Sequence, residues 1–76
     1  SDGEVEFIRS AVDGVFLPLI EHNHYVKKGD LIGEVVDPFE GTVKRQIRTE
    51  RGGLLFTLRA YPVVYEGDLL ARILTE

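Results

Sequence analysis

Short stretches in which apolar and polar residues alternate run along the whole chain, and turns that contain glycine separate them. Alternation with a period of two is typical of strands, because successive side chains then point to opposite faces of a sheet. No stretch keeps the roughly 3.6-residue period of an amphipathic helix. The pattern predicts an all-β fold with about seven or eight short strands. The strands that it places with bounds are 6–10, 15–20, 31–36, 45–49, 54–59 and 69–74.

The two halves of the chain repeat one another. When Ile8 is aligned with Ile47, several residues match at a shift of 39, among them Gly14 with Gly53. Further along, "KGDLIGEV" at 28–35 matches "EGDLLARI" at 66–73 at a shift of 38. Two copies are too few for a solenoid, which needs about three repeats. We therefore expect one domain over 1–76, built from two interlocking halves (about 6–36 and about 45–74) as two stacked sheets or a flattened barrel.

The composition restricts the classes of function. The 76 residues have a net charge of −4 and include neither Cys nor Met. The lack of cysteine excludes disulfides and thiolate metal sites, and the acidic balance opposes nucleic-acid binding. The longest apolar run, at 15–20, contains Pro18 and is far shorter than the roughly 20 residues of a membrane span. We expect a cytoplasmic domain that binds no nucleic acid and no membrane, and a fragment of a longer protein.

The first half resembles a known type of domain. Residues 11–14 have the pattern A-x-x-G, and "VKKGDLI" follows at 26–32. Both are typical of biotinyl/lipoyl-type barrel-sandwich hybrids, which occur as carrier domains and in periplasmic adaptors. Such a carrier has its modified lysine in the hairpin between the halves, which falls at 35–42 here. That segment contains no lysine, and Lys44 lies beyond the expected tip, so the carrier chemistry is lost.

A second resemblance is narrower and covers about residues 4–74. The hairpin "GEVVDPFE" at 33–40 and the segment "RAYPVVYEGD" at 59–68 are similar to the C-terminal domain of the succinylglutamate desuccinylase/aspartoacylase family. Glu40 precedes Gly41 here, where the family motif has glycine at once. The resemblance implies a barrel-sandwich hybrid whose two duplicated halves are related by pseudo-twofold symmetry.

The family resemblance also implies an activity for a parent protein. By this resemblance, the parent would be a zinc-dependent deacylase that cleaves the amide of N-acyl amino acids or similar substrates. In such enzymes, a His-x-x-Glu motif and a later His bind the zinc. That motif belongs to the preceding catalytic domain and is absent from this sequence. We therefore expect a non-catalytic C-terminal accessory domain with no cofactor of its own, whose parent binds zinc. Its expected partner is the catalytic domain of the same parent protein. We expect this domain to pack on the catalytic domain and to narrow the active-site entrance. The resemblance also allows a homo-oligomer.

Two other classes stay open beside the hydrolase domain. One is a stand-alone carrier or adaptor module, against whose carrier form the missing lysine argues. The other is a pure interaction module without a modified lysine. Adaptors of efflux pumps normally have long helical arms between their halves, whereas only about 37–42 intervenes here.

Candidate functional residues lie mainly in the segment 59–63. Arg59 has the geometry to bind a substrate carboxylate in a bidentate manner, and Tyr61 can donate a hydrogen bond. With Pro62 and Val63, these residues are candidates for the substrate entrance or for the contact with the catalytic domain. No catalytic residue is expected in the chain.

His22 and His24 have the only metal-like spacing. On a strand, residues two apart share a face, so both imidazoles would meet one metal there. Two imidazoles without a third ligand nearby form a weak site, and an exposed loop before Val26 is the other interpretation. Asp30 and Asp68 follow glycine at equivalent turns, where we expect their carboxylates to accept backbone hydrogen bonds.

A basic cluster begins the second half. Lys44, Arg45, Arg48 and Arg51 form it, and Glu50 interrupts it. Solvated surface charge is one interpretation, and docking to an acidic surface is the other.

Overall fold

The computed structural model describes residues 4–76, so the first three residues of the expected domain lie outside the described part. No helix that could cross a membrane occurs among these residues. The strands are β1 (Val5–Arg9), β2 (Gly14–Pro18), β3 (His24–Val26), β4 (Leu31–Val36), β5 (Val43–Arg48), β6 (Gly53–Leu58), β7 (Val63–Val64) and β8 (Leu69–Thr75). The predicted all-β fold with short strands is confirmed.

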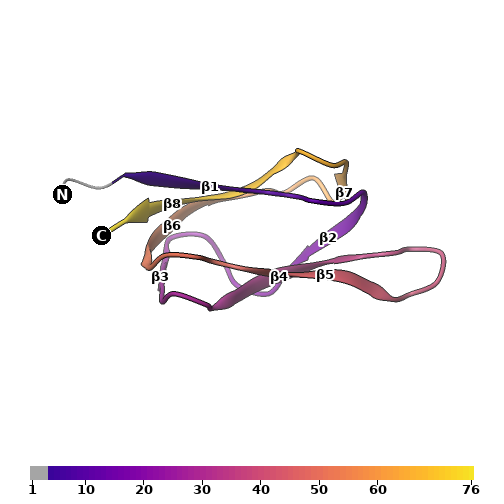
Figure 1. Cartoon of the computed structure of the whole chain (residues 1–76), viewed down its shortest axis with the longest axis horizontal. Coiled ribbons are helices and arrows are strands. Elements are labelled where there is room, and N and C mark those ends of the chain that lie inside the picture. Colours follow the sequence, from indigo (N-terminus) through magenta and orange to yellow (C-terminus); the bar gives the residue numbers. More distant parts are fainter. Residues whose placement is uncertain (1–3) are drawn as a thin grey trace.

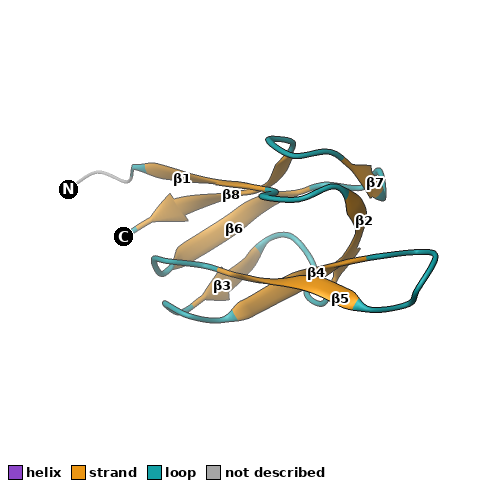
Figure 2. Ribbon diagram, turned by 45° about the vertical axis from the view of Figure 1, so that its right-hand side comes forward, coloured by secondary structure: helices purple, strands orange, loops and turns teal. Residues whose placement is uncertain are grey.

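The strands form two antiparallel sheets of four strands each. Their orders are β1-β8-β6-β3 and β5-β4-β2-β7. Figure 1 shows β1, β8 and β6 in one layer and β4 with β5 in the other, and Figure 2 shows the two layers from a second side. The hairpin between β4 and β5 extends from one end of the molecule, which measures 43 × 18 × 17 Å.

The two sheets have equivalent strand orders. Equivalent strands of the two halves differ by four in their numbers, so β1 corresponds to β5 and β8 to β4. With this correspondence, the order of the first sheet becomes the order of the second. Four of the six pairings, β1 with β8, β2 with β7, β3 with β6 and β4 with β5, join a strand of the first half to one of the second. The halves are therefore interlocked, as the repeat predicts, while the pseudo-twofold relation between their coordinates stays a prediction.

The hydrophobic core fills the space between the sheets. Phe16, Ile32, Val35, Leu55 and Ile73 are at most 2% exposed. Ile32 and Val35 are three residues apart on β4 and are both buried, and the pairing of β4 with β5 shifts its register between Leu31 and Gly33. Removal of the core side chains from water is the main driving force for folding. The remaining core residues are Ile8, Val26, Ile47, Val64, Leu70 and Ala71.

Each Gly-Asp turn docks on the other half of the chain. In the first half, the Gly29 N–H donates to the Thr49 carbonyl (2.8 Å). In the second half, the Gly67 N–H donates in the same way to the Ser10 carbonyl (2.7 Å). Thr49 and Ser10 directly follow β5 and β1, so each turn fixes the end of a strand from the opposite half.

The carboxylates of the two turns have the structural role that the sequence predicts. Asp30 Oδ2 accepts a hydrogen bond from the Lys27 N–H (2.8 Å), and Asp68 Oδ2 accepts one from the Tyr65 N–H (2.8 Å). The two bonds are equivalent at a shift of 38, so the duplication extends to side-chain hydrogen bonds.

Some element bounds differ from the predicted ones. β2 and β6 begin at Gly14 and Gly53, which the sequence pattern assigns to turns. β2 ends at Pro18, two residues before the predicted end, although the Leu19 N–H still donates to the Ile32 carbonyl of β4 (2.9 Å). The strands β3 and β7 have three and two residues, too few to give a periodic pattern.

Candidate functional site

Four valines form a continuous row across the outer face of the second sheet. Val36 of β4 pairs with Val43 of β5 on one side and with Val15 of β2 on the other, and Val15 pairs with Val63 of β7. Residues that pair directly in adjacent strands share a face. Val43 is 50% exposed and Val63 is 38% exposed. We call these four residues the valine row, and no part of residues 4–76 covers it fully.

The apolar surface extends beyond the valine row along β2. Leu17 lies two residues after Val15 and therefore on the same face, and it is 44% exposed. Beside it, the Phe16 N–H donates to the Pro62 carbonyl (2.8 Å), which continues the pairing of β2 past the end of β7. Tyr61, which directly precedes Pro62, is 67% exposed. The segment 61–63 thus forms one edge of an apolar surface over β2 and β7.

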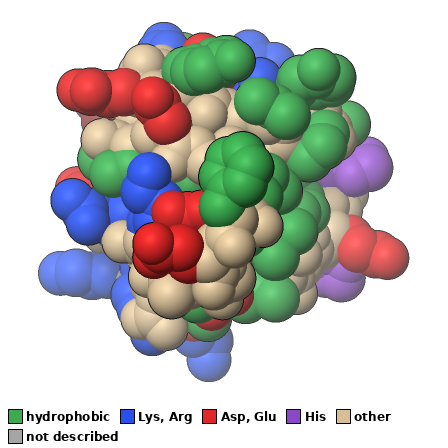
Figure 3. Space-filling model, turned by 90° about the vertical axis from the view of Figure 1, so that its right-hand side faces the viewer, with side chains coloured by type: hydrophobic (Ala, Val, Ile, Leu, Met, Phe, Trp, Pro, Cys, Tyr) green, Lys and Arg blue, Asp and Glu red, His purple; other side chains and the backbone are tan. Residues whose placement is uncertain are grey.

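The hairpin between β4 and β5 closes one end of this surface. A hollow of about 300 Å³ lies there, and Val15, Val63, Pro38, Phe39 and Tyr65 are among the residues that line it. Phe39 is 97% exposed, although it is large and apolar. Figure 3 views this end and shows hydrophobic side chains running from the centre towards the upper right. An apolar surface of this kind, bordered by polar residues, is typical of a docking site.

The hairpin tip is a compact turn that presents no lysine. Asp37 Oδ1 accepts hydrogen bonds from the N–H groups of Phe39 (2.8 Å) and Glu40 (3.2 Å). The Lys44 ammonium donates to the Asp13 carbonyl (2.6 Å), so this side chain bends back to the body of the domain.

Arg59 holds the segment 61–63 in place. Its Nε donates to the Tyr61 carbonyl (2.9 Å) and its Nη2 to the Val63 carbonyl (3.0 Å). Its Nη1 donates to the Leu69 carbonyl (3.4 Å), and Nη2 lies 3.5 Å from Asp68 Oδ2. The guanidinium is therefore occupied by partners inside the domain. This arrangement positions Tyr61, Pro62 and Val63 and leaves little capacity for a bidentate bond to a substrate carboxylate.

The two histidines do not lie on one strand. His24 is the first residue of β3, whereas His22 lies before the strand, and Asn23 between them has a φ of 65°. A left-handed residue breaks the alternation that would put both imidazoles on one face. The exposed-loop interpretation is therefore correct for His22, while His24 is an exposed residue of a strand. Residues 4–76 contain no group of three or more His, Cys, Asp or Glu placed to hold a metal ion.

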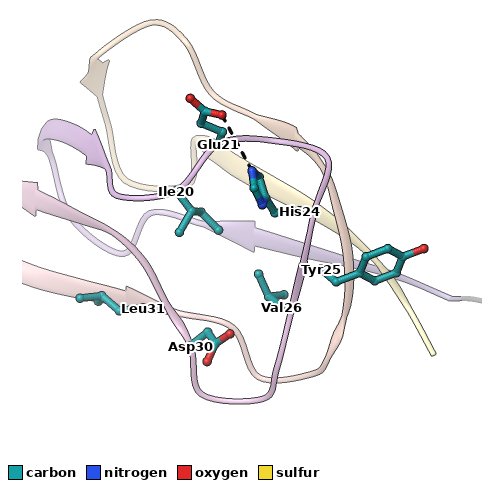
Figure 4. Close-up of a pocket in the computed structure, with 7 residues that line it drawn as sticks. All are labelled: Ile20, Glu21, His24, Tyr25, Val26, Asp30 and Leu31. Atoms are coloured by element: carbon teal, nitrogen blue, oxygen red, sulfur yellow. Dashed lines mark ion pairs between the residues drawn. The ribbon is translucent and has the colours of Figure 1, made fainter.

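Each histidine lines its own hollow. His24 lines one of about 540 Å³ with Glu21 and Asp30 (Figure 4). Its Nε2 lies 3.8 Å from Glu21 Oε1, and both side chains are well exposed, so the pair contributes little to stability. His22 lines a neighbouring hollow of about 560 Å³, together with Arg59. The structure thus brings His22 near the candidate segment, a proximity that the linear sequence does not reveal.

Most of the apolar docking surface escapes the sequence analysis. Of its residues, only Tyr61, Pro62 and Val63 are among the predicted site residues. The sequence analysis places Val15 and Val36 in strands and assigns them no role in a site. The missing signal is the cross-strand pairing, which aligns residues from four strands. Phe39 gives a local signal, because a large aromatic residue at the tip of a hairpin has nothing inside the hairpin to pack on.

Comparison with known proteins gives structural matches. No protein-family model and no curated protein matches the chain. The ectoine utilization protein EutE (DoeB) from Ruegeria pomeroyi is similar at a TM-score of 0.81 and 30% identity over 92% of this chain. A succinylglutamate desuccinylase from Silicibacter sp. TM1040 is similar at a TM-score of 0.74 and 28% identity over 100% of this chain. The chain spans 22% and 23% of the lengths of these two proteins.

A similar fold also occurs in a protein with a different named function. The urea carboxylase of Kluyveromyces lactis matches 92% of this chain at a TM-score of 0.76 and 22% identity, over 6% of its own length. At this identity the match shows the fold alone, and a fold does not determine a function. The structures named after the succinylglutamate desuccinylase/aspartoacylase family have TM-scores of 0.72–0.82. The resemblance that the sequence motifs predict is thus confirmed, and the chain has the fold of a domain of the succinylglutamate desuccinylase/aspartoacylase family.

Proposed function

We propose that the chain is the non-catalytic C-terminal accessory domain of a longer hydrolase, a zinc-dependent deacylase that cleaves the amide of N-acyl amino acids or similar substrates. The observation that carries the proposal is the match to EutE, which covers 92% of this chain but only 22% of that protein. A relationship of this kind is expected when one domain corresponds to a part of a larger enzyme. The likeness to a succinylglutamate desuccinylase at 28% identity supports the same class.

The zinc belongs to the other part of the proposed hydrolase. A catalytic zinc needs about three protein ligands and an open position. Residues 4–76 offer no such cluster, and the two histidines lie in different hollows. The residues of this domain therefore do not fit a zinc site, and we derive no catalytic step from them.

The role of the domain in this proposal is to pack on the catalytic domain and narrow the active-site entrance. The valine row, with Leu17 and Phe39, is the surface that supports such packing, because its apolar area stays in contact with water in the isolated chain. Arg59 acts as a positioning residue, since it fixes the backbone of 61–63 beside this surface.

The first test is the mass and zinc content of the natural gene product. We expect a polypeptide several times longer than 76 residues that contains about one zinc ion per chain. A natural product of 76 residues without zinc would contradict the proposal. In that case, the second candidate function, an interaction or adaptor module without a modified lysine, would replace it, because the hairpin at 35–42 contains no lysine.

The second test locates the packing surface in the longer protein. The substitutions Val15→Glu and Val63→Glu together place two charges on the valine row, and we expect faster proteolysis between the domains and a lower kcat/KM. Tyr25→Glu is the matched control, because Tyr25 is 74% exposed on the outer face of the other sheet. An equal effect of the control, or no effect of the pair, would show that the valine row is not the packing surface.

A further inference from the structure

A groove lies between the free edges of the two sheets. β1 and β5 are edge strands, because each pairs with one neighbour, β8 and β4. Side chains of both edges line the groove, which has a volume of about 320 Å³. Ile8 and Ile47 are 9% and 8% exposed there and come from equivalent positions of the two halves. The groove thus combines an apolar floor with two strand edges whose outward backbone groups have no strand partner among residues 4–76.

Three arginines give the groove a positive charge. Arg9, Arg45 and Arg48 line it, and none of them forms an ion pair among residues 4–76. Their printed partners are backbone carbonyls: Arg9 donates to Gly67 (3.1 Å), Arg45 to Lys44 (3.1 Å) and Arg48 to Gly29 (2.9 Å). A guanidinium has five N–H donors, so each side chain keeps donors for a carboxylate.

Two carboxylates, Glu6 and Glu50, also line the groove, so its three arginines leave it a net charge of +1 (3 − 2). Glu6 accepts hydrogen bonds from the Thr49 hydroxyl (3.2 Å) and the Glu50 N–H (3.1 Å), one on each carboxylate oxygen. Both of its oxygens are therefore used within the domain. The concentration of positive charge is notable because the whole chain has a net charge of −4.

We propose that this groove binds an extended acidic polypeptide segment, which adds to the free edge of β5 as a further strand. Strand addition supplies main-chain hydrogen bonds, and side chains of alternate residues supply specificity. Arg45 and Ile47 are two residues apart and share one face of β5, so a carboxylate and an apolar residue on the same face of the added strand would reach Arg45 and the Ile8–Ile47 floor. A carboxylate on its other face would reach Arg48. Charge on an edge strand also protects it from aggregation. That function needs charge of either sign and does not require an apolar floor flanked by three arginines.

The inference goes beyond the proposed accessory function. The groove lies along β1 and β5, whereas Leu17, Tyr61 and Val63 lie over β2 and at β7, the opposite edge of the second sheet. The surface that we assign to the catalytic domain shares β5 with the groove only through Val43, and its other residues lie on β2, β4, β7 and the hairpin tip. A nucleic acid is a poorer occupant, since a molecule with a net charge of −4 repels a long polyanion.

The experiment uses the 76-residue chain, whose buried side-chain polar atoms in 4–76 all have hydrogen-bond partners. The probe is a blocked heptapeptide of glutamate and valine, in which glutamate occurs on both faces of the extended chain, titrated into the ¹⁵N-labelled protein and followed by NMR. We expect saturable shifts at the amides of β1 and β5 and slower hydrogen exchange of the outward amides of β5. A peptide with lysine in place of glutamate serves as the charge control and is expected to cause no such shifts.

Two variants with equal loss of charge make the test specific. Arg45→Gln is expected to weaken binding roughly tenfold, which corresponds to one lost charge-assisted hydrogen bond of about 1.4 kcal/mol. Arg72→Gln is the control, because Arg72 lies 5.0 Å from the Phe56 ring centre and donates to Thr57 Oγ1 (3.1 Å), outside the groove. Its affinity for the probe is expected to match the wild type.

Three outcomes would overturn the proposal. The first is no shift at millimolar peptide. The second is an equal loss of affinity in both variants, which would show long-range attraction without a site. The third is the same set of shifts with inorganic phosphate and no protection of the β5 amides, which would show a simple anion contact. None of these outcomes depends on a parent enzyme, so they are independent of the proposed function.

Discussion

Arg59 is the residue at which the two halves differ most in their hydrogen bonds. The residue aligned with it at a shift of 39 is Ile20, which has no polar group. As a result, Asp68 has a cationic partner 3.5 Å away, while the equivalent Asp30 forms no ion pair among residues 4–76. The duplication predicts the Gly-Asp turns, but it cannot predict this asymmetry, because the asymmetry depends on a position at which the two halves differ.

The difference between the two turns gives a prediction for stability. Asp30→Ala and Asp68→Ala each remove an acceptor of a backbone N–H, which is worth about 1 kcal/mol of unfolding free energy. Asp68→Ala also removes the ion pair, which is worth about 0.2–1 kcal/mol for a partly exposed pair. We expect urea denaturation to show the larger loss for Asp68→Ala. If Arg59→Ala abolishes the difference between the two, the ion pair is its cause, and a difference that persists would contradict this assignment.

Gly53 is the residue whose replacement the backbone tolerates least. Its φ is 153°, and an added Cβ would overlap the Leu74 carbonyl oxygen. We expect Gly53→Ala to lower the unfolding free energy by about 3 kcal/mol or more, because conformational strain and a backbone clash add. Gly41→Ala is the control, since Gly41 has a φ of 72° but no atom within 4 Å of the added Cβ, and it should cost about 1–2 kcal/mol. Equal melting temperatures for the two variants would contradict the role of the close approach.

At the scale of elements, the sequence predicts the long strands and misses the short ones. The bounds of β4 are predicted at both ends, because a Gly-Asp turn precedes Leu31 and Asp37-Pro38 follows Val36. β7 contains two residues and exists because Val64 and Val63 pair with Gly14 and Val15. Such a strand is defined by its partner and has no pattern of its own. The valine row escapes prediction for the same reason, since it requires the register of four strands.

Two phenylalanines allow the core and the exposed surface to be compared with one residue type. Phe16 is 2% exposed between the sheets, whereas Phe39 is 97% exposed at the hairpin tip. We expect Phe16→Ala to cost about 3–5 kcal/mol of unfolding free energy and Phe39→Ala to change it by less than about 0.5 kcal/mol. Thermal unfolding of the isolated chain measures both. A large loss for Phe39→Ala would show that the tip packs on the domain and is not available for docking.

At the scale of the whole molecule, the interlocked pairing makes the two halves dependent on each other. Within the first half, the one paired contact is that of β2 with β4, and within the second half it is that of β6 with β8. A two-stranded pair is marginally stable at best in water. We expect peptides 1–38 and 39–76 to be unfolded separately and to regain strand structure when mixed, as measured by circular dichroism. Stable strand structure in either peptide alone would contradict the interlocked arrangement.

The sequence identifies the whole-molecule architecture better than it identifies the site. The repeat predicts two interlocking halves, and the motifs at 33–40 and 59–68 lead to the family whose fold the structure has. The groove between β1 and β5 could not be predicted, because Arg9 and Arg45 are 36 residues apart in the sequence and meet only after the sheets stack. The basic cluster at 44–51 contains Arg45 and Arg48 of the groove, but it does not indicate that Arg9 lies beside them.

The position of the chain ends has a mechanical consequence. Val5 pairs with Leu74, so the described chain enters and leaves the domain at the same end (Figure 1). A force that pulls the two ends apart would act on the hydrogen bonds between β1 and β8. Because the two strands are antiparallel and the force enters both at the same end, these bonds would break one pair at a time. The load would never be shared across the whole strand. Under tension the domain would therefore open first at β1, and the loss of this strand would remove one wall of the arginine-lined groove together with the core residue Ile8.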